Sequence, residues 1–429
     1  MKFLSKINRN LILKITSLNS LVVGFRLVIS LFVQNLLAQY TGQSGISKVG
    51  QIRNLSNILM SISSLGVFNG IVKFVSEFKE KEKELVKLFS TVYVLSTIAT
   101  IFLSTALFFF AESLSMWLFF SKKFILVFKL LSVAVPFIAM NRIFNGIISG
   151  ISAYKINAKI EIIWYSLASI ILVISLYYYN IKGVLISIAL TPLIQFIILI
   201  LIFGKSIKEY VNISKLSFKT PMLKVLLGFT FISFVATVCL NFVEINFRTM
   251  IADKISEDQA GIWTAMSSIS KIYMQFLITI FSIYILPKYS SINYSHELRN
   301  EISLIFKSLL PLVISGMLLV YFLREYLVLI IYNETFLGMT ILFKWQLMAD
   351  FVRFSANILS FKFLAKKQIS HFLTTQFFGL LTYYFLGKLL IIGFNIEGLV
   401  MALFFSNLLY FLIVFLFLRK DLFGINRPI

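Results

Sequence analysis

The stretch LILKITSLNSLVVGFRLVISLFVQNLLA, residues 11–38, is apolar over a length that can cross a lipid bilayer as one helix. Arg26 lies near the middle of this stretch. A guanidinium at that depth costs several kcal/mol unless it faces a hydrated cavity or a partner of opposite charge. The sequence therefore predicts a membrane-spanning first helix that places a cation inside the protein rather than in lipid.

Similar apolar stretches follow along the whole chain and predict an all-α polytopic membrane protein with about twelve transmembrane helices. The composition agrees, because only 14% of the residues are charged, whereas soluble domains average about 25%. Turn-forming residues at 179–183, 286–288 and 393–395 mark boundaries. The apolar segment 324–335 is too short to cross and is expected at the membrane interface. The predicted spans are 11–38, 49–74, 86–111, 124–150, 159–179, 183–204, 225–250, 260–286, 302–323, 337–364, 370–392 and 396–418.

Lysine and arginine residues outside these spans gather in alternate loops. Because the cytoplasmic loops of membrane proteins collect positive charge, this bias predicts that both termini lie in the cytoplasm. The bias also accounts for much of the formal net charge of +22. A nucleic-acid partner is therefore not needed to explain the basic composition, and none is expected.

The longest connection, residues 205–224, is basic and lies near the middle of the chain. It predicts an N-terminal six-helix lobe (1–204) and a C-terminal six-helix lobe (225–429), joined by a cytoplasmic linker, around a central cationic cavity. Two repeats around a midplane cavity are a common plan among transporters. A faint internal echo agrees, since small residues follow both the first and the seventh span, at Gly42, Gly45, Gly50, Ala260 and Gly261.

Basic residues inside the predicted spans are candidates for binding an anionic substrate. An intramembrane cation marks a substrate pathway by default, and arginine matches phosphate oxygens well. The competing interpretation is structural, because a cation near the end of a span, such as Arg53, can extend to the interface. The candidates are Arg26, Arg53, Arg248, Lys271 and Arg353.

Two acidic residues inside the spans, Glu244 and Asp350, are candidates for coupling or gating. Glu244 lies four residues before Arg248, so the two share a helix face and predict either a structural ion pair or an outer gate. Asp350 lies three residues before Arg353. This carboxylate either neutralises the arginine or takes up a proton when a partner leaves.

Metal and cofactor chemistry are not expected. Cys239 is the single cysteine, and the two histidines, His296 and His371, lie at loop edges, whereas a zinc site needs three or four nitrogen or sulfur ligands. The sequence contains no nucleotide-binding loop and no histidine-based triad. We therefore expect a transporter without a cofactor, not an enzyme.

Three runs of sequence resemble the Wzx flippases: GVFNGIVKFVSEF (66–78), GIWTAMSSISKIYMQFLITIFSIYILPKYSSI (261–292) and FKWQLMADFVRF (343–354). These flippases belong to the multidrug/oligosaccharidyl-lipid/polysaccharide exporter superfamily, and the likeness is nearest to the translocases for enterobacterial common antigen and related O-antigens. The resemblance implies a twelve-helix, two-lobed bundle in the bacterial inner membrane. It also implies the flipping of undecaprenyl-pyrophosphate-linked oligosaccharide from the cytoplasmic to the periplasmic leaflet, among membrane lipids. Polysaccharide polymerase machinery is a candidate partner, and the sequence leaves open whether the protein works alone or alongside it.

The charge pattern of the family is matched only in part. The pyrophosphate and its sugars would enter the basic cavity while the polyprenyl tail stays in lipid, and protonation of Asp350 would bias release. Departures from the pattern reflect a different glycan or local pairing, and they fall at Glu244, Arg142 and Lys271. The matching positions are Arg26, Arg53, Arg248, Asp350 and Arg353.

Other classes of function stay open at this point. A cation-coupled drug exporter of the same fold should have an acidic or aromatic cavity, whereas these spans are net basic. An O-antigen polymerase or ligase should carry a large periplasmic loop with catalytic residues, and none of the predicted loops is large. A lipid II flippase for peptidoglycan shares the head-group chemistry, but fourteen spans rather than twelve would be expected.

Overall fold

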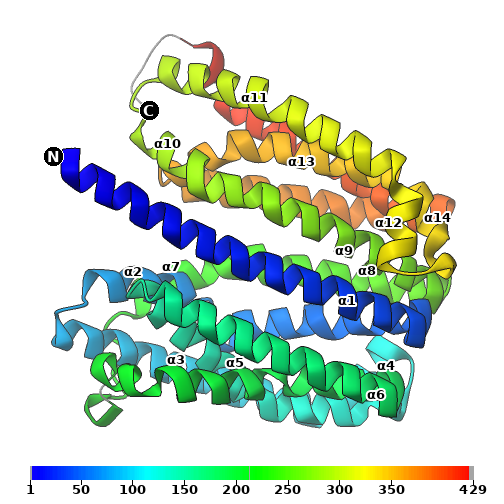
Figure 1. Ribbon diagram of the computed structural model, residues 1–429, viewed down its shortest axis with the longest axis horizontal. Coiled ribbons are helices and arrows are strands. Elements are labelled where there is room, and N and C mark those ends of the chain that lie inside the picture. Colours follow the sequence, from blue (N-terminus) through cyan, green and yellow to red (C-terminus); the bar gives the residue numbers. More distant parts are fainter. Residues whose placement is uncertain (1, 212, 425–429) are drawn as a thin grey trace. The chain divides into compact units, whose positions relative to one another are not determined.

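The computed structural model describes the backbone of residues 2–211 and 213–424, and the side chains from residue 21 onward except at 208, 212, 213, 232, 233, 235, 236, 276, 278–280, 282 and 283. The regular elements of the described residues are helices (Figure 1). The α-helices are α1 (Lys2–Ser63), α2 (Phe68–Glu77), α3 (Glu82–Phe109), α4 (Ala111–Phe119), α5 (Ile125–Gly150), α6 (Tyr154–Tyr210), α7 (Leu223–Ser233), α8 (Leu240–Lys254), α9 (Glu257–Ile280), α10 (Leu286–Ser291), α11 (Ser295–Phe322), α12 (Arg324–Ile331), α13 (Leu342–Ala365) and α14 (Ile369–Phe423). Short 3₁₀ segments are η1 (Lys122–Phe124), η2 (Ile213–Lys215) and η5 (Glu334–Ile341), and π segments are η3 (Phe234–Cys239) and η4 (Phe281–Ile285).

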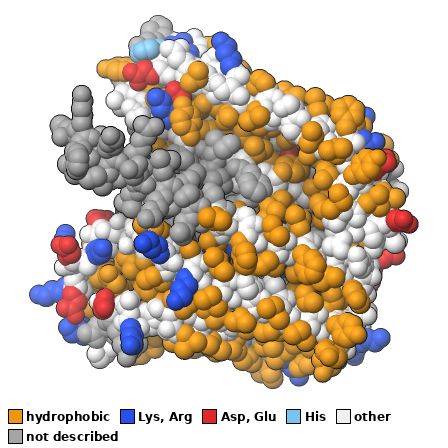
Figure 2. All heavy atoms as spheres, viewed as in Figure 1, with side chains coloured by type: hydrophobic (Ala, Val, Ile, Leu, Met, Phe, Trp, Pro, Cys, Tyr) orange, Lys and Arg blue, Asp and Glu red, His pale blue; other side chains and the backbone are white. Residues whose placement is uncertain are grey.

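Six helices in the described part of the chain are long and apolar enough to cross a membrane, which confirms a polytopic all-α membrane protein. A helix suits the bilayer because it satisfies its backbone hydrogen bonds internally. Large apolar side chains point outward, as at Phe109 (76% exposed) and Leu201 (79% exposed). Figure 2 shows that hydrophobic side chains cover most of the face in view, with charged side chains toward the helix ends. The total of twelve spans stays a prediction.

Three of the long helices, α1, α6 and α14, are each broken at one residue, and each corresponds to two of the predicted spans. The breaks fall at Gly42 (φ 62°), Asn180 (φ 52°) and Asn395 (φ 50°). Glycine takes a left-handed φ without steric cost, and asparagine tolerates it better than most residues. Asn180 also caps the next segment, since its Oδ1 accepts a hydrogen bond of 2.7 Å from the backbone N–H of Ile181. The turn signals at 179–183 and 393–395 are thus confirmed as helix breaks.

An internal repeat relates the segment from α3 to α6 to the segment from α11 to α14. The helix breaks in α6 and α14 share the sequence pattern Asn-Ile-x-Gly, which ends at Gly183 in α6 and at Gly398 in α14. A Cβ on either glycine would lie 2.4 Å from the carbonyl oxygen of Ser175 or 2.2 Å from that of Leu390, so both turns exclude side chains.

The helices before these turns repeat in the same way. Helices α3 and α11 have 28 residues each, and each leads into a short helix. Left-handed residues then follow α5 and α13, at Ser152 (φ 58°) and Lys367 (φ 55°). Helix α5 packs against α3 and α6, as α13 packs against α11 and α14. This repeat is far stronger than the faint echo of small residues in the sequence.

Contacts along the chain divide it into two compact units. The first comprises the residues up to Thr41 together with Lys48–Ile245, and the second comprises Gly42–Ser47 together with the residues from Asn246 onward. Each unit has its own apolar core, centred in the first on α2, α3, α5 and α6 and in the second on α11, α13, α14 and η4. The lobe limits expected from the sequence (1–204 and 225–429, with a linker at 205–224) stay a prediction.

Two predicted spans end differently from expectation. The span expected over 49–74 stops as a helix at Ser63, because Leu65 (φ 46°) and Gly66 (φ 59°) form a left-handed turn before α2. The span expected over 260–286 continues through η4 and α10 to Ser291. Pro287 does not end it, because proline is tolerated in the first turn of a helix, where its missing N–H has no intrahelical partner.

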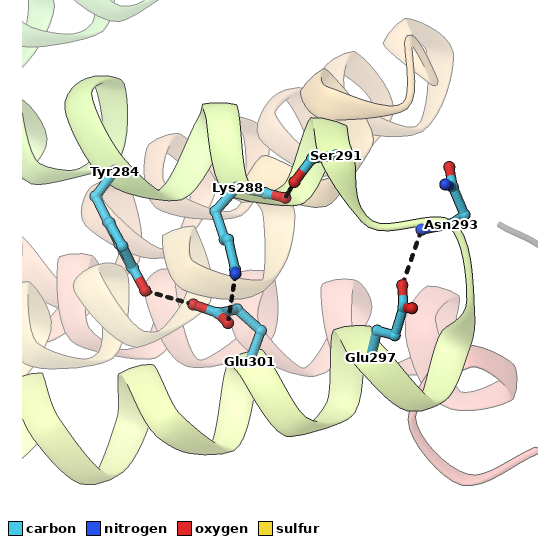
Figure 3. A network of polar contacts seen from close by, with 6 residues as sticks. All are labelled: Tyr284, Lys288, Ser291, Asn293, Glu297 and Glu301. Carbon is cyan, nitrogen blue, oxygen red and sulfur yellow. Dashed lines mark hydrogen bonds and ion pairs between the residues drawn. The ribbon is translucent and has the colours of Figure 1, made fainter. Parts of the chain in front are cut away.

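A polar network fastens η4 and α10 to the start of α11 in the second unit (Figure 3). The Tyr284 hydroxyl donates a hydrogen bond of 2.7 Å to Glu301 Oε1, and Lys288 Nζ lies 3.7 Å from Glu301 Oε2. The backbone N–H of Asn293 donates to Glu297 Oε2 at 3.2 Å. Glu301 is only 9% exposed, and its contacts with Tyr284 and Lys288 compensate for the burial of its charge.

Candidate functional site

Arg26 lies in the first part of α1 and pairs with an acid that the sequence analysis did not single out. Its Nη1 lies 2.8 Å from Oε2 of Glu161 in α6. The guanidinium carbon is also 4.9 Å from the ring centre of Tyr165 and 5.7 Å from that of Trp164. The side chain of Arg26 is 42% exposed and that of Glu161 is 15% exposed. One cation is thus held by a carboxylate and two aromatic faces within the first unit.

Arg53 lies in the second part of α1 and is exposed. Its neighbours in sequence bind α8. Asn54 Nδ2 donates a hydrogen bond of 2.8 Å to Oε2 of Glu244, which is 8% exposed, and Asn57 Nδ2 donates to Asn241 Oδ1 at 3.2 Å. These asparagines lie in the predicted span 49–74, and they connect two helices of the first unit.

Arg248 is 2% exposed and lies in the part of α8 that belongs to the second unit. Its Nε donates a hydrogen bond of 2.7 Å to Thr264 Oγ1 in α9. Its guanidinium carbon lies 5.4 Å from the ring centre of Trp263. A hydrogen bond and a cation–π contact therefore hold this buried cation. Its expected pairing with Glu244 stays a prediction.

Asp350 in α13 is 4% exposed and is held by neutral groups. Its Oδ2 accepts hydrogen bonds from Ser270 Oγ at 2.6 Å, from the Tyr273 hydroxyl, and from Gln346 Nε2 at 3.1 Å. Gln346 also donates to Ser270 Oγ at 3.1 Å, which closes the network. The donors to Asp350 in the described part of the chain do not include Arg353, which lies three positions further along α13.

The remaining candidates flank this network in the second unit. Lys271 follows Ser270 in α9 and is exposed, and Arg353 is partly exposed one turn beyond Asp350. A carboxylate that is bound by hydroxyl and amide donors can change its charge without breaking an ion pair. The network is therefore chemically suited to gaining and losing a proton.

A further intramembrane charge pair, between Lys362 and Asp421, was not predicted from the sequence. Lys362 Nζ lies 3.0 Å from Oδ2 of Asp421, and both side chains are nearly buried, at 4% and 5% exposed. The lysine also donates to Gln368 Oε1 at 3.1 Å. This pair joins the ends of α13 and α14, so we assign it to the stability of the second unit.

Groups of three or more histidine, cysteine, aspartate or glutamate residues that could hold a metal ion do not occur among the described residues. The charged and polar groups described above lie within or beside the predicted spans. They consist of guanidinium and ammonium groups, the carboxylates of Glu161, Glu244, Asp350 and Asp421, and neighbouring hydroxyl and amide groups.

Comparison with solved structures relates the fold to known transporters. The chain is similar to an inward-facing multidrug resistance MATE family transporter of the MOP superfamily, with a TM-score of 0.79 and 12% identity over 92% of this chain and 94% of that chain. It is also similar to the lipid II flippase MurJ in an inward closed conformation, with a TM-score of 0.72 and 15% identity over 94% of this chain and 88% of that chain. At these identities the likeness shows a shared fold.

Comparison of sequences gives a closer relation. The chain is 25% identical over 350 residues to the lipid III flippase of Escherichia coli (strain K12), which covers 81% of this chain and 83% of that protein, and the figures are the same for the lipid III flippase of Shigella flexneri. A family model described as polysaccharide biosynthesis protein matches residues 49–341. Because this match spans more than half of the sequence, the chain belongs to the polysaccharide biosynthesis protein family.

Proposed function

We propose that this protein is a flippase for undecaprenyl-pyrophosphate-linked oligosaccharide, an O-antigen or enterobacterial-common-antigen repeat unit. It moves this lipid from the cytoplasmic to the periplasmic leaflet of the bacterial inner membrane and is a transporter rather than an enzyme. Similarity to the lipid III flippases over four fifths of the chain supports this proposal, as does membership of a polysaccharide biosynthesis family. The charge bias of the loops supports an orientation with both termini in the cytoplasm.

The observation that carries the proposal is the excess of cations within the spans. A pyrophosphate is a dense anion, and guanidinium groups bind phosphate oxygens through paired hydrogen bonds. We assign pyrophosphate and sugar binding to Arg26, Arg53, Arg248, Lys271 and Arg353.

Transport then follows alternating access. The head group enters a cationic cavity, while the polyprenyl chain stays in lipid. The lobes reopen toward the periplasm, and protonation of Asp350 couples an ion gradient to release. Glu244 acts as a gate, because its contact with Asn54 joins α1 to α8 and can be made or broken as these helices move. A polysaccharide polymerase would receive the flipped lipid.

A cation-coupled drug exporter is the second candidate, because the fold is shared with MATE family transporters. The net basic spans argue against it, since a cationic drug requires an acidic or aromatic site. A drug-resistance assay separates the two. Expression of an exporter would raise the tolerated concentration of cationic dyes, whereas a flippase would leave it unchanged.

The deciding experiment is complementation of a Gram-negative strain that lacks its own flippase, followed by leaflet analysis of the undecaprenyl-linked glycan. The wild type should restore surface glycan. Arg26→Ala and Arg353→Ala should leave the intermediate on the cytoplasmic side, whereas Lys182→Ala, which removes an exposed lysine, should behave as the wild type. If the glycan crosses normally without this protein and only its polymerisation or attachment fails, the flippase proposal is wrong.

A further inference from the structure

The ion pair between Arg26 and Glu161 lies within the first unit, where it binds the arginine that the proposed function assigns to the pyrophosphate. The two charged atoms are 2.8 Å apart, so Glu161 occupies a position from which a phosphate oxygen would contact the same guanidinium. The carboxylate is the more enclosed partner, at 15% exposed against 42% for the arginine. The arginine is thus accessible to a ligand while its partner is largely enclosed.

The aromatic contacts keep the guanidinium in place independently of Glu161. Tyr165 and Trp164 lie 4.9 and 5.7 Å from it, and both belong to the same helix as Glu161. A guanidinium has five N–H donors, and the ion pair engages it through Nη1. The indole N–H of Trp164 is buried without a hydrogen-bond partner in the described part of the chain. Donors therefore remain on or beside Arg26 that Glu161 does not use.

We propose that Glu161 is a displaceable counter-ion, which neutralises Arg26 in the empty transporter and competes with the substrate pyrophosphate for it. Binding of the pyrophosphate breaks the ion pair and leaves the carboxylate partly buried without its cation. That cost raises the free energy of the loaded state and favours release after the transporter has reopened. Glu161 is thus a positioning residue that sets the affinity, and the inference rests on the proposed function.

The direction in which the affinity changes when Glu161 is replaced distinguishes a competing counter-ion from a residue that only supports Arg26. A supporting residue strengthens binding, so its removal would weaken the affinity. A competing counter-ion weakens binding, so its removal would strengthen it. For an ion pair between partly exposed groups we expect Glu161→Gln to lower the Kd about threefold to fivefold. The release rate should fall by a similar factor.

The experiment uses the purified full-length protein in lipid nanodiscs, with undecaprenyl pyrophosphate as the probe and undecaprenol as the uncharged reference. The Kd is measured for the wild type, Glu161→Gln and Arg26→Ala. Glu82→Gln is the matched control, because it removes an exposed ion pair of 2.7 Å with Lys215 in the same unit. We expect Arg26→Ala to bind more weakly, Glu161→Gln more tightly, and Glu82→Gln as the wild type.

Two outcomes would overturn the inference: a Kd of Glu161→Gln equal to that of the wild type, or a Kd higher than that of the wild type. If Glu161→Gln does not fold, Glu161→Asp replaces it, because a carboxylate shorter by one methylene reaches Arg26 less well and should give a smaller tightening. Failure of the proposed function would give a different result from failure of this inference. In that case the wild type itself would not prefer undecaprenyl pyrophosphate to undecaprenol, whereas failure of the inference leaves that preference intact.

Discussion

Replacement of Asp350 by asparagine tests whether the charge of this carboxylate, and not its shape, serves transport. The side chains have nearly the same size, and the amide oxygen of an asparagine can accept from the same three donors, Ser270, Tyr273 and Gln346. The variant therefore keeps the network and removes only the ability to carry a negative charge.

The expected change in stability can be worked from these contacts. A hydrogen bond to a charged group contributes about 1 kcal/mol more than a neutral one, so three weakened bonds cost about 3 kcal/mol. Because a neutral side chain does not carry the desolvation penalty of a buried charge, removal of the charge stabilises the folded state by several kcal/mol. We therefore expect Asp350→Asn to change the free energy of unfolding by less than about 2 kcal/mol, with a normal yield of folded protein.

Transport should change far more than stability. If Asp350 couples proton uptake to release, Asp350→Asn should lower the rate of glycan flipping at least tenfold in reconstituted vesicles and flatten its dependence on pH. Asp253→Asn is the matched control, because it makes the same chemical change at an exposed position of α8. Rates equal to the wild type at every pH would remove Asp350 from the mechanism, and severe unfolding would refute the estimate from the hydrogen bonds.

Three further changes test the fold. Lys362→Met removes the cation that lies 3.0 Å from the buried carboxylate of Asp421. The loss of this charge-assisted hydrogen bond should destabilise the protein by about 1.5–3 kcal/mol, measured as a lower Tm. A Tm within the error of the wild type would show that the pair is not needed. Gly398→Ala places a Cβ 2.2 Å from a backbone oxygen and should lower the Tm. Gly393→Ala is the control, because its Cβ meets no atom within 4 Å, and it should leave the Tm unchanged. Equal Tm values for the two variants would contradict the tight turn. Outside the membrane spans, Lys122 holds the pKa of Glu112 below its usual range, so the ion pair stabilises the fold above the ordinary glutamate pKa and loses this effect as pH falls through the lowered pKa. The Tm difference between the wild type and Glu112→Gln should accordingly be present at neutral pH and vanish in acid; a difference independent of pH would contradict this assignment.

Sequence patterns predicted the elements whose signals are local. Apolar stretches of span length predicted the membrane helices, and the asparagines at 180 and 395 predicted the breaks of α6 and α14, because a residue's tolerance of left-handed φ is a property of that residue. The break at Ser63 was not predicted, since Gly66 lies among apolar residues that continue the span pattern. Hydropathy measures which solvent a segment prefers, and it does not show where the backbone turns within that solvent.

The partners of the intramembrane charges were predicted less well, for a physical reason. Spacings of three or four residues identify neighbours on one helix, and this predicted a link from Asp350 to Arg353. The groups that bind the Asp350 carboxylate come partly from α9, about eighty positions earlier in the sequence. The acid that pairs with Arg26 lies in α6. Contacts between helices depend on packing, which the periodicity of a single helix does not contain.

Glu161 and Asp350 are intramembrane carboxylates with different kinds of partner, and this difference separates their proposed roles. Glu161 pairs with a cation, so protonating it would sacrifice an ion pair, whereas an anionic ligand can replace it at Arg26. Asp350 is bound by neutral donors, so a ligand phosphate gains nothing by replacing it, whereas a proton can neutralise it while its neighbours stay in place. Competition with the substrate is therefore expected at Glu161 and coupling to protons at Asp350. A transporter must both bind the pyrophosphate and release it. Competition from Glu161 would limit the affinity for the pyrophosphate, and protonation of Asp350 would promote its release.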